Sequence, residues 1–560
     1  MSVFQPVISL GDLDGSNGFR IDGAVKLDRS GNSVSSAGEI NGDGFADLII
    51  GERRPYSSGE EYRGSSYVVF GSATPSSANL SLENLNGANG FWIDGSWLYD
   101  FSDANVSSAG EINGDGIDEF IIGARRAGFS DALYAGASYV IFGSQSRFVA
   151  DLSVDGLDGT NGFRLAGEAG DDNSGNIVSS AGDVNGDGIA DLLIGAYRAD
   201  VDGERNAGSS YVVFGSKDPF SAETPLSTLN GVNGARIDVV EGGDYSGGSA
   251  SSAGDVNGDG FDDVIIGASS ADPESGVNAG SSYVVFGSED GFAAQLSLGL
   301  LDGTNGFRLD GAAEGDRSGS SVSSAGDING DRIDDLVIGA IRADPNGIYN
   351  AGASYVVFGS DMGFAANLSL SALDGTNGFR IDGGAIKDGS GSAVSSAGDV
   401  NGDGVDDLLI GVRVADPGGL SGAGSTYVVF GSKAGFSSSL SLSSLDGSNG
   451  FKLNGVAAGD LSGGSISSAG DVNGDGVDDL VVGAAGADPG AKDGAGLTYV
   501  IFGIQSNRAP VAETAAIMGD EDTVISGALT ATDIDGDVLS FTLVDGPSNG
   551  AVAINADGTF

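Results

Sequence analysis

Residues 181–196 read AGDVNGDGIADLLIGA, an acidic glycine-containing turn between a segment of small residues and an apolar segment. The turn recurs as [DE]-[VI]-N-G-D-G, or once as DINGDR, starting at Glu39, Glu111, Asp183, Asp255, Asp327, Asp399 and Asp471. Each start lies 72 residues after the previous one. Seven copies in constant register indicate a repeat architecture, and this organisation governs every other assignment.

Each unit contains four segments of strand character, which resemble GFRIDG (18–23), SVSSAGDIN (321–329), DDLLIG (406–411) and SYVVFG (354–359). They are short, rich in β-branched and aromatic residues, and bounded by Gly, Asp, Asn and Ser. No segment keeps a helical period, so we expect almost no helix. The pattern predicts an all-β fold in which residues 1–504 form a seven-bladed β-propeller with four strands per blade. A solenoid would need atypical repeats at its ends, whereas the first and seventh units resemble the others.

The composition of the strands predicts their order within a blade. The Ser/Ala/Gly-rich segment suits the crowded axis, so we expect it innermost, followed outward by the DDLLIG-like, YVVFG-like and GFRIDG-like segments. The last unit has no GFRIDG segment after Gly503. We therefore predict that the copy at 18–23 completes the last blade and pairs Phe19–Ile21 with Tyr499–Phe502.

Composition excludes several classes of function. The chain has 560 residues, no Cys and no His, which rules out thiolate sites, Ser-His-Asp catalysis and most zinc sites. Its formal net charge of −54 argues against binding to nucleic acids or anionic membranes. No apolar run is long enough to span a bilayer, so we expect no direct membrane insertion. The first residues lack the basic and apolar regions of a Sec signal.

The recurrent turn extends to D-x-N-x-D-G-x-x-D, as in Asp183–Asp191. Side-chain oxygens at positions 1, 3, 5 and 9, with the carbonyl of position 7, match the oxygen ligands that Ca²⁺ prefers. A single such loop is equally well read as an Asx-rich turn, but seven copies with an acid at position 9 favour calcium. We expect up to seven Ca²⁺ ions, one per blade. The predicted ligands are Glu39, Asn41, Asp43, Phe45 and Asp47; Glu111, Asn113, Asp115, Ile117 and Glu119; Asp183, Asn185, Asp187, Ile189 and Asp191; Asp255, Asn257, Asp259, Phe261 and Asp263; Asp327, Asn329, Asp331, Ile333 and Asp335; Asp399, Asn401, Asp403, Val405 and Asp407; and Asp471, Asn473, Asp475, Val477 and Asp479.

The seven sites should differ in strength. Arg332 replaces the glycine of position 6 in the fifth unit, where a left-handed backbone costs a non-glycine residue about 1–2 kcal/mol. Its positive charge also lies near the ion. We predict that the fifth site is the weakest.

The pattern GDVNGDGxDDLxIGA with a recurring YVVFG resembles the FG-GAP repeat of integrin alpha subunits and of bacterial surface proteins, over residues 7–504. This resemblance implies a seven-bladed propeller with calcium in hairpin loops on one face. After a short linker (505–510), residues 511–560 resemble the start of a cadherin-like or VCBS-type domain, here an incomplete β-sandwich. The acids that resemble interdomain calcium ligands are Asp520, Glu521, Asp522, Asp533, Asp535 and Asp537. The resemblance implies part of a longer surface protein, extracellular or on the cell surface, exported by a non-Sec route.

Three functions compete on this evidence. The first is a calcium-binding extracellular module for cell adhesion or protein interaction, with an unknown protein or glycan ligand. The second is a calcium-dependent lectin, which should carry aromatic residues at one fixed position of every blade. The candidates Tyr56, Tyr62, Trp92, Trp97, Tyr134 and Tyr349 are instead scattered. The third is an enzyme, which we do not expect, because the recurrent Asp200, Asp272, Asp344, Asp416 and Asp488 are interpreted as turn caps or as support for the ligands.

Overall fold

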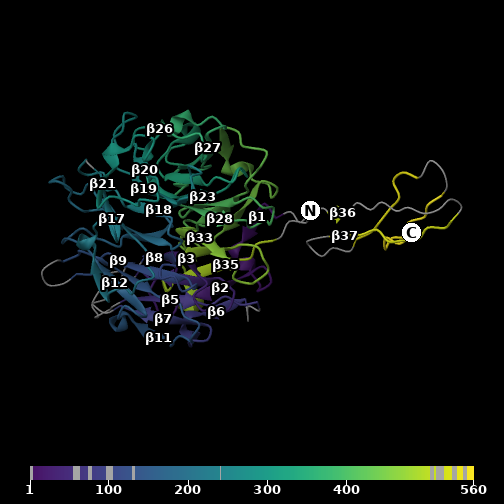
Figure 1. Cartoon of the computed structure of the whole chain (residues 1–560), viewed down its shortest axis with the longest axis horizontal. Coiled ribbons are helices and arrows are strands. Elements are labelled where there is room, and N and C mark those ends of the chain that lie inside the picture. The colour runs from purple at the N-terminus through teal and green to yellow at the C-terminus, as the bar shows by residue number, and fades with distance from the viewer. Residues whose placement is uncertain are drawn as a thin grey trace.

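The protein is described by a computed structural model that covers residues 4–53, 64–73, 78–95, 105–128, 133–239, 241–504, 510–512, 523–532, 539–546 and 551–560. Seven five-stranded sheets surround a common axis and form the predicted propeller (Figure 1). Within the described residues the helices are three-residue 3-10 turns only. None of the helices there is long and apolar enough to cross a membrane.

Blades are numbered by the 72-residue unit that supplies their innermost strand. From blade 1 to blade 7 the innermost strands are β3 (Ser33–Gly38), β8 (Asn105–Gly110), β13 (Ile177–Gly182), β18 (Ser249–Gly254), β23 (Ser318–Gly326), β28 (Ala393–Gly398) and β33 (Ser465–Gly470). The second strands are β4 (Asp47–Gly51), β9 (Glu119–Ala124), β14 (Asp191–Ala196), β19 (Asp263–Ala268), β24 (Asp335–Ala340), β29 (Asp407–Val412) and β34 (Asp479–Ala484). The third strands are β5 (Ser65–Val69), β10 (Ala137–Ile141), β15 (Ser209–Val213), β20 (Ser281–Val285), β25 (Ala353–Val357), β30 (Ser425–Val429) and β35 (Leu497–Ile501).

The outer strands follow in the same blade order. The fourth strands are β7 (Gly90–Asp94), β12 (Gly162–Ala166), β17 (Gly234–Asp238), β22 (Gly306–Asp310), β27 (Gly378–Asp382), β32 (Gly450–Asn454) and β2 (Gly18–Asp22). The fifth strands are β11 (Asp151–Ser153), β16 (Glu223–Pro225), β21 (Gln295–Ser297), β26 (Asn367–Ser369), β31 (Ser439–Ser441), β1 (Val7–Ser9) and β6 (Asn79–Ser81). Each fifth strand continues into a 3-10 turn: η3 (Val154–Gly156), η4 (Leu226–Thr228), η5 (Leu298–Leu300), η7 (Leu370–Ala372), η9 (Leu442–Ser444), η1 (Leu10–Asp12) and η2 (Leu82–Asn84). Three further turns, η6 (Pro345–Gly347), η8 (Pro417–Gly419) and η10 (Pro489–Ala491), lie between second and third strands.

The fifth strand corrects the prediction of four strands per blade. The GFRIDG-like segment is the fourth strand, and the three residues of the fifth lie outside it, parallel to it. In blade 3, Gln295, Leu296 and Ser297 pair with Arg236, Ile237 and Asp238. Three residues are too few to show a periodic pattern, because only one of them faces the core.

The predicted strand order and ring closure are otherwise confirmed. The Ser/Ala/Gly-rich strands pack against one another around the axis, with β33 against β3. In blade 7, Phe19, Arg20 and Ile21 of β2 pair with Val500, Tyr499 and Thr498 of β35. The chain also closes a second blade, because β1 pairs with β32 in blade 6. Strands from the N-terminal end of the propeller sequence therefore complete two neighbouring blades, blades 6 and 7.

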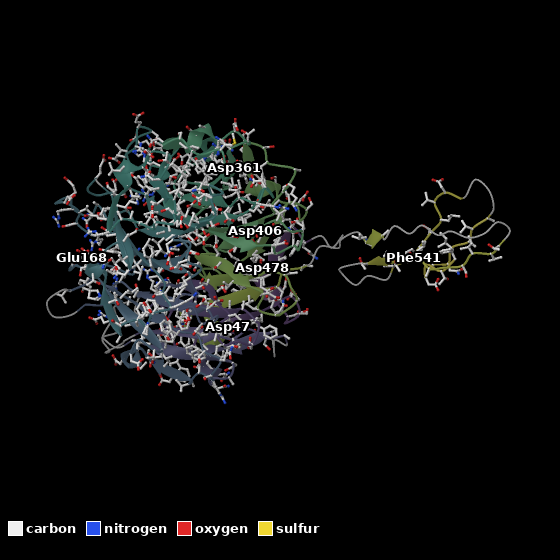
Figure 2. The ribbon with its side chains drawn as sticks, in the orientation of Figure 1. Asp47, Glu168, Asp361, Asp406, Asp478 and Phe541 are labelled. Carbon is white, nitrogen blue, oxygen red and sulfur yellow. The ribbon has the colours of Figure 1, made fainter. Side chains whose placement is uncertain are left out.

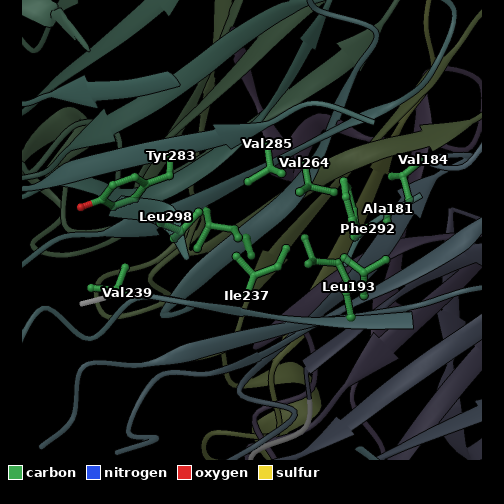
Figure 3. Close-up of a cluster of buried hydrophobic side chains, with 14 of the residues drawn as sticks. Ala181, Val184, Leu193, Ile237, Val239, Val264, Tyr283, Val285, Phe292 and Leu298 are labelled. Carbon is green, nitrogen blue, oxygen red and sulfur yellow. The ribbon is translucent and has the colours of Figure 1, made fainter. Parts of the chain in front are cut away.

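The hydrophobic core lies between adjacent blades. Every residue of a second strand such as β14 is buried, because its alternate side chains face the two neighbouring sheets. Between blades 3 and 4, Leu193 and Ile237 pack against Val264 and Tyr283 across the interface (Figure 3). Seven such layers hold the ring together.

The described part of the tail shows little regular structure. β36 (Val511–Ala512) pairs with β37 (Ala531–Thr532), and Ala528 forms an isolated bridge with Thr559. Most of the predicted linker, residues 505–509, and all six tail acids named above lie outside the described residues.

Candidate metal centres

All seven acidic loops lie on one face of the ring. Each loop joins an innermost strand to the second strand of the same blade, so the repeat places the loops at equivalent positions around the axis. Figure 2 shows Asp47, Asp406 and Asp478 near the middle of the propeller. The sequence prediction of one loop per blade is therefore matched by their placement.

Within the loop of blade 3, the side-chain oxygens point at the loop's own backbone. The Asp187 N–H donates to Asp183 Oδ1 (3.1 Å) and to Asn185 Oδ1 (3.0 Å). The Gly188 N–H donates to Asp183 Oδ2 at 2.8 Å. Asp187 Oδ1 in turn accepts from the Ile189 N–H at 3.0 Å. The loop thus gathers carboxylate and amide oxygens toward its own centre.

Position 9 is the most buried acid of the loop. Asp191 is fully buried, and its two oxygens accept from the N–H groups of Val184 (3.1 Å) and Gly215 (2.9 Å). Gly215 follows the third strand, so this carboxylate fastens the loop to the YVVFG segment of the same blade. In blade 2, Glu119 at this position accepts from the Ile112 N–H and from the Asn113 side-chain amide, both at 2.7 Å.

The charges of the loop repel one another. Burial raises the pKa of Asp191 to about 8, despite the hydrogen bonds from Gly215 and Val184, and the charges of Asp187 and Asp183 raise it further. Five other position-9 carboxyls, those of Asp47, Glu119, Asp263, Asp335 and Asp479, likewise have pKa values raised to about 8. Asp407 in blade 6 is raised well above its ordinary value, mainly by burial. A divalent cation would relieve both the repulsion and the burial cost.

The donor set fits calcium in its chemistry. An acid, an amide oxygen, a second acid, a backbone carbonyl and a third acid are all hard oxygen ligands. Among the described residues, however, no three Asp or Glu side chains come together closely enough to form a metal-binding cluster by themselves. Binding therefore requires the carboxylates at positions 1 and 5 to exchange loop N–H groups for the ion. The complete ligand set remains a prediction.

The fifth loop carries the expected strain. Arg332 has a φ of +76°, in the left-handed region that its glycine counterparts adopt freely. The Arg332 N–H donates to Asp327 Oδ2 at 2.8 Å, as the glycine does in the loops of blades 3, 4, 6 and 7. The loop keeps its shape at the cost of an unfavourable backbone conformation. Its weaker affinity for calcium stays a prediction.

Comparison with protein families identifies the repeats. The model described as "FG-GAP repeat" matches residues 30–69, 174–213, 247–285, 318–357, 390–429 and 462–501. The chain contains six FG-GAP repeats. The unit with Glu111 and Glu119 is not among the six matches, although it forms blade 2. Residues 507–560 match the model described as "Bacterial Ig domain", where the sequence analysis expected a cadherin-like or VCBS-type domain.

Curated proteins similar to this FG-GAP chain include integrin alpha subunits. Integrin alpha pat-2 of Caenorhabditis elegans is 30% identical over 254 residues, which are 44% of this chain and 19% of the relative. Integrin alpha-PS5 of Drosophila melanogaster is 32% identical over 171 residues, 30% of this chain and 15% of the relative. Phosphatidylinositol-glycan-specific phospholipase D of Bos taurus is 30% identical over 177 residues, 31% of this chain and 19% of the relative. The chain thus spans less than a fifth of each of these three proteins.

The FG-GAP propeller contains one set of acids whose role the sequence analysis missed. At position 8, five units carry an aspartate that accepts a hydrogen bond from the position-1 N–H of the preceding blade. We call Asp118, Asp262, Asp334, Asp406 and Asp478 the inter-blade aspartates; the bonds measure 2.7–3.0 Å. Blades 1 and 3 have Ala46 and Ala190 instead. The signal was visible in the recurrence of an aspartate directly before the position-9 acid, but the sequence does not show which neighbouring residue each of these aspartates contacts.

The innermost strands are built around these contacts. Gly182 ends β13 with a φ of +74°, and a Cβ there would lie 2.2 Å from Asp262 Oδ2. Glycine is required at this position because the neighbouring blade approaches so closely. The inter-blade aspartates therefore lock the spacing between successive acidic loops.

The opposite face carries the second recurrent set of acids. Asp200 Oδ1 accepts from the Asn206 N–H at 2.9 Å, and Asp272 Oδ1 from the Asn278 N–H at 2.7 Å. The same bond recurs at Asp344, Asp416 and Asp488. These aspartates close the loops between second and third strands, which confirms their interpretation as turn caps.

The aromatic residues considered for a lectin do not form a repeated set. Tyr134 and Tyr349 are exposed, but their separation is not a multiple of 72 residues. Trp92 lies in β7 and pairs with Tyr67 in the sheet of blade 1. Tyr56, Tyr62 and Trp97 lie outside the described residues.

Proposed function

We propose that the chain is a calcium-binding extracellular module for adhesion or protein interaction, in which calcium stabilises each blade. The observation that carries this proposal is the recurrence, in every acidic loop, of a buried position-9 carboxyl beside two further acids at positions 1 and 5. Asp191 is fully buried, and its pKa is raised to about 8 by burial, with Asp187 and Asp183 adding to the shift. A divalent cation bound at each of these seven groups would offset the cost of burying the carboxylate beside other acids.

The architecture supports a binding role for the rigid ring. Calcium would add metal–oxygen bonds to the hydrogen bonds that already hold the seven loops in place. The similarity to integrin alpha subunits supports protein recognition and an extracellular or cell-surface location. The match of the tail to a bacterial Ig domain supports membership of a longer surface protein. Together these features favour a scaffold that presents loops to a partner.

We infer a binding rather than a catalytic function. One similar protein is a phospholipase by name, but its similarity covers 31% of this chain. The chain has no His or Cys, and the recurrent acids outside the acidic loops that the structure describes serve as turn caps or as inter-blade contacts. A carbohydrate ligand is less well supported, because the exposed aromatic residues do not repeat from blade to blade.

Thermal unfolding of the full chain in excess calcium and in a chelator tests the proposal. A ligand that binds only the folded state stabilises it by about 2.7 kcal/mol per site at one hundred times its Kd. With up to seven sites, we expect a large upward shift of the midpoint in calcium, and little shift in magnesium at the same concentration. Equal midpoints in calcium and chelator would mean that the loops are only turns.

Two double variants make the test specific. Asp183→Asn with Asp187→Asn should remove one site and reduce the calcium-dependent shift. Asp200→Asn with Asp272→Asn removes the same number of charges from the opposite face and should leave that shift unchanged. If both pairs reduce it equally, net charge rather than loop binding explains the effect.

A further inference from the structure

Five blades share a cluster of three phenylalanine rings on the acidic-loop face. In blade 2, Phe142 follows the third strand, Phe163 lies in the fourth, and Phe220 precedes the fifth. Phe163 and Phe220 stack with ring centroids 4.3 Å apart and planes 6° apart, and Phe142 lies 5.9 Å from each. The same stacked pair occurs in blades 1, 4, 5 and 6, at 4.1–4.6 Å.

Blade 3 lacks the middle ring. Ala235 occupies the position of Phe163, and Phe214 and Phe292 lie 6.4 Å apart, tilted by 40°. Both rings are more than nine-tenths buried, because they turn into the space that alanine leaves. A Cβ on Gly291 would lie 3.1 Å from the Phe214 ring, whereas a Cβ on the equivalent Gly363 would meet nothing within 4 Å. The Phe214 ring is therefore displaced relative to its counterparts.

A cavity of about 570 Å³ lies between the Phe163–Phe220 pair of blade 2 and Phe214 of blade 3. The three rings, with Val213 and Pro219, give the cavity its apolar lining. Four exposed carboxylates line the rest: Asp187, Asp218, Glu289 and Asp290. No lysine or arginine is among the described residues of the lining.

A related cavity between blades 5 and 6 differs in charge. It has a volume of about 630 Å³ and is lined by Phe430, Phe436 and several serines, with Asp382 as its one carboxylate among the described residues. Part of the lining therefore recurs with the repeat, but the four carboxylates do not. At the position of Glu289, the repeat has Lys217, Asp361 or Lys433 in the preceding and following units. The blade-3 cavity combines the missing ring with an unusual concentration of negative charge.

We propose that this cavity binds the side chain of a lysine or arginine from a partner protein. The aliphatic stem would lie against the apolar part of the lining, and the cationic group would meet the carboxylates and the partly exposed ring of Phe220. A bare metal ion gains nothing from an apolar wall, and an anion is repelled by the carboxylates. The proposal specifies one contact of the interaction module proposed above. Because Asp187 is also a predicted calcium ligand, the proposal depends on the other three carboxylates, those of Asp218, Glu289 and Asp290.

Saturation-transfer NMR and calorimetric titration of the full chain test this site. The probes are the peptide acetyl-Ala-Arg-Ala-amide and its citrulline counterpart, which has the same shape without the charge. We expect the arginine peptide to bind about tenfold more tightly than the citrulline peptide at low salt. A lysine peptide should compete with it. Equal affinities for arginine and citrulline would overturn the proposal.

Variants locate the binding to the cavity. Ala235→Phe restores the ring of the other blades, should return Phe214 toward its usual place, and should abolish binding. Glu289→Gln with Asp290→Asn changes only exposed charges and should weaken the arginine peptide about tenfold. Asp361→Asn, at the position equivalent to Glu289 in the next unit, is the matched control and should bind as the unaltered chain does. Undiminished binding by the Glu289/Asp290 variant would refute the assignment.

The same titrations in calcium and in chelator separate this proposal from the calcium proposal. Peptide binding without any calcium-dependent stabilisation would support the cavity and contradict the metal sites. Calcium-dependent stabilisation with no peptide binding would contradict the cavity and leave the metal sites supported.

Discussion

The inter-blade aspartates offer a test of what couples neighbouring blades. Asp334 of blade 5 accepts from the Asp255 N–H of blade 4 at 2.9 Å, while its own N–H donates to the Asp255 carbonyl at 3.3 Å. Asp334→Ala removes the first bond and keeps the second. We predict that this substitution destabilises the propeller and that the reverse change, Ala190→Asp in blade 3, stabilises it.

The magnitude follows from two opposing terms. A hydrogen bond to a charged group contributes about 1.5–3 kcal/mol. Burial raises the pKa of Asp334, and the charges of Asp262 and Asp406 raise it further, so forming the carboxylate costs part of that gain. We expect a net loss of about 1 kcal/mol for one substitution. Removing all five inter-blade aspartates should cost about 3–5 kcal/mol, less than strict addition, because their mutual repulsion is removed as well.

The reverse substitution is possible in the two units that have alanine at position 8. The Ala190 Cβ lies 2.8 Å from a Cβ built on Gly110, close to the 2.6 Å between the Asp262 Cβ and a Cβ built on Gly182. An aspartate at position 190 should therefore reach the Glu111 N–H without rearrangement. Ala46→Asp should act in the same way in blade 1.

Urea unfolding of the variants in 0.5 M NaCl measures these effects, because the salt screens exposed charges beyond roughly 4 Å. The fivefold alanine variant should unfold at lower urea and the double aspartate variant at higher urea. The reasoning fails if the fivefold variant unfolds with the unaltered chain, or if both changes act in the same direction.

Three further predictions concern other parts of the ring. Asp244 is buried on the face opposite the acidic loops, and burial, with the charges of Glu241 and Asp272, raises its pKa to about 7. Because the folded state binds this proton more tightly than the unfolded state, the contribution of Asp244 to stability should decline as pH rises from about 4 to 7. Asp244→Asn should flatten this pH dependence in melting curves recorded across that range. Phe379→Ala removes a fully buried ring that stacks on Phe436 with ring centroids 4.2 Å apart, and it should lower the free energy of chemical unfolding by about 3–5 kcal/mol. A loss below about 1 kcal/mol would be incompatible with this packing. Arg332→Gly relieves a φ of +76°, so it should stabilise the chain by about 1 kcal/mol in the chelator and tighten calcium binding at the fifth loop. A lower stability or a weaker calcium affinity after the substitution would contradict the strain argument.

The ring and its closure could be predicted because they follow from a constant period and from the order of strand-like segments. A repeat of 72 residues with an unpaired GFRIDG at its start leaves one way to complete the last blade, and β2 pairs with β35 as expected. The fifth strand was missed because three residues with one inward side chain carry no periodic signal. Its existence depends on a neighbouring strand to pair with, which is a tertiary effect.

The acidic loops could likewise be predicted only in part from the sequence. Their residue types were readable because a turn requires fewer acids than each loop contains. The partners of those acids were not, because Asp191 and Asp187 accept from backbone N–H groups whose positions depend on the folded loop. The exchange of Phe for Ala235 is visible in the sequence, yet its consequence for Phe214 requires the packing of two blades.

The closure of blade 7 also determines how the propeller carries mechanical load. β35 lies between β34 and β2, with five residue pairs on each side, and the chain continues from it toward the Ig-like tail. Because antiparallel hydrogen bonds run perpendicular to the strands, tension along β35 shears both ladders at once instead of breaking bonds one after another. β1, by contrast, has three paired residues on one side. Pulling on the tail should thus meet much greater resistance than pulling on β1, and the propeller is suited to bear force that arrives through the tail.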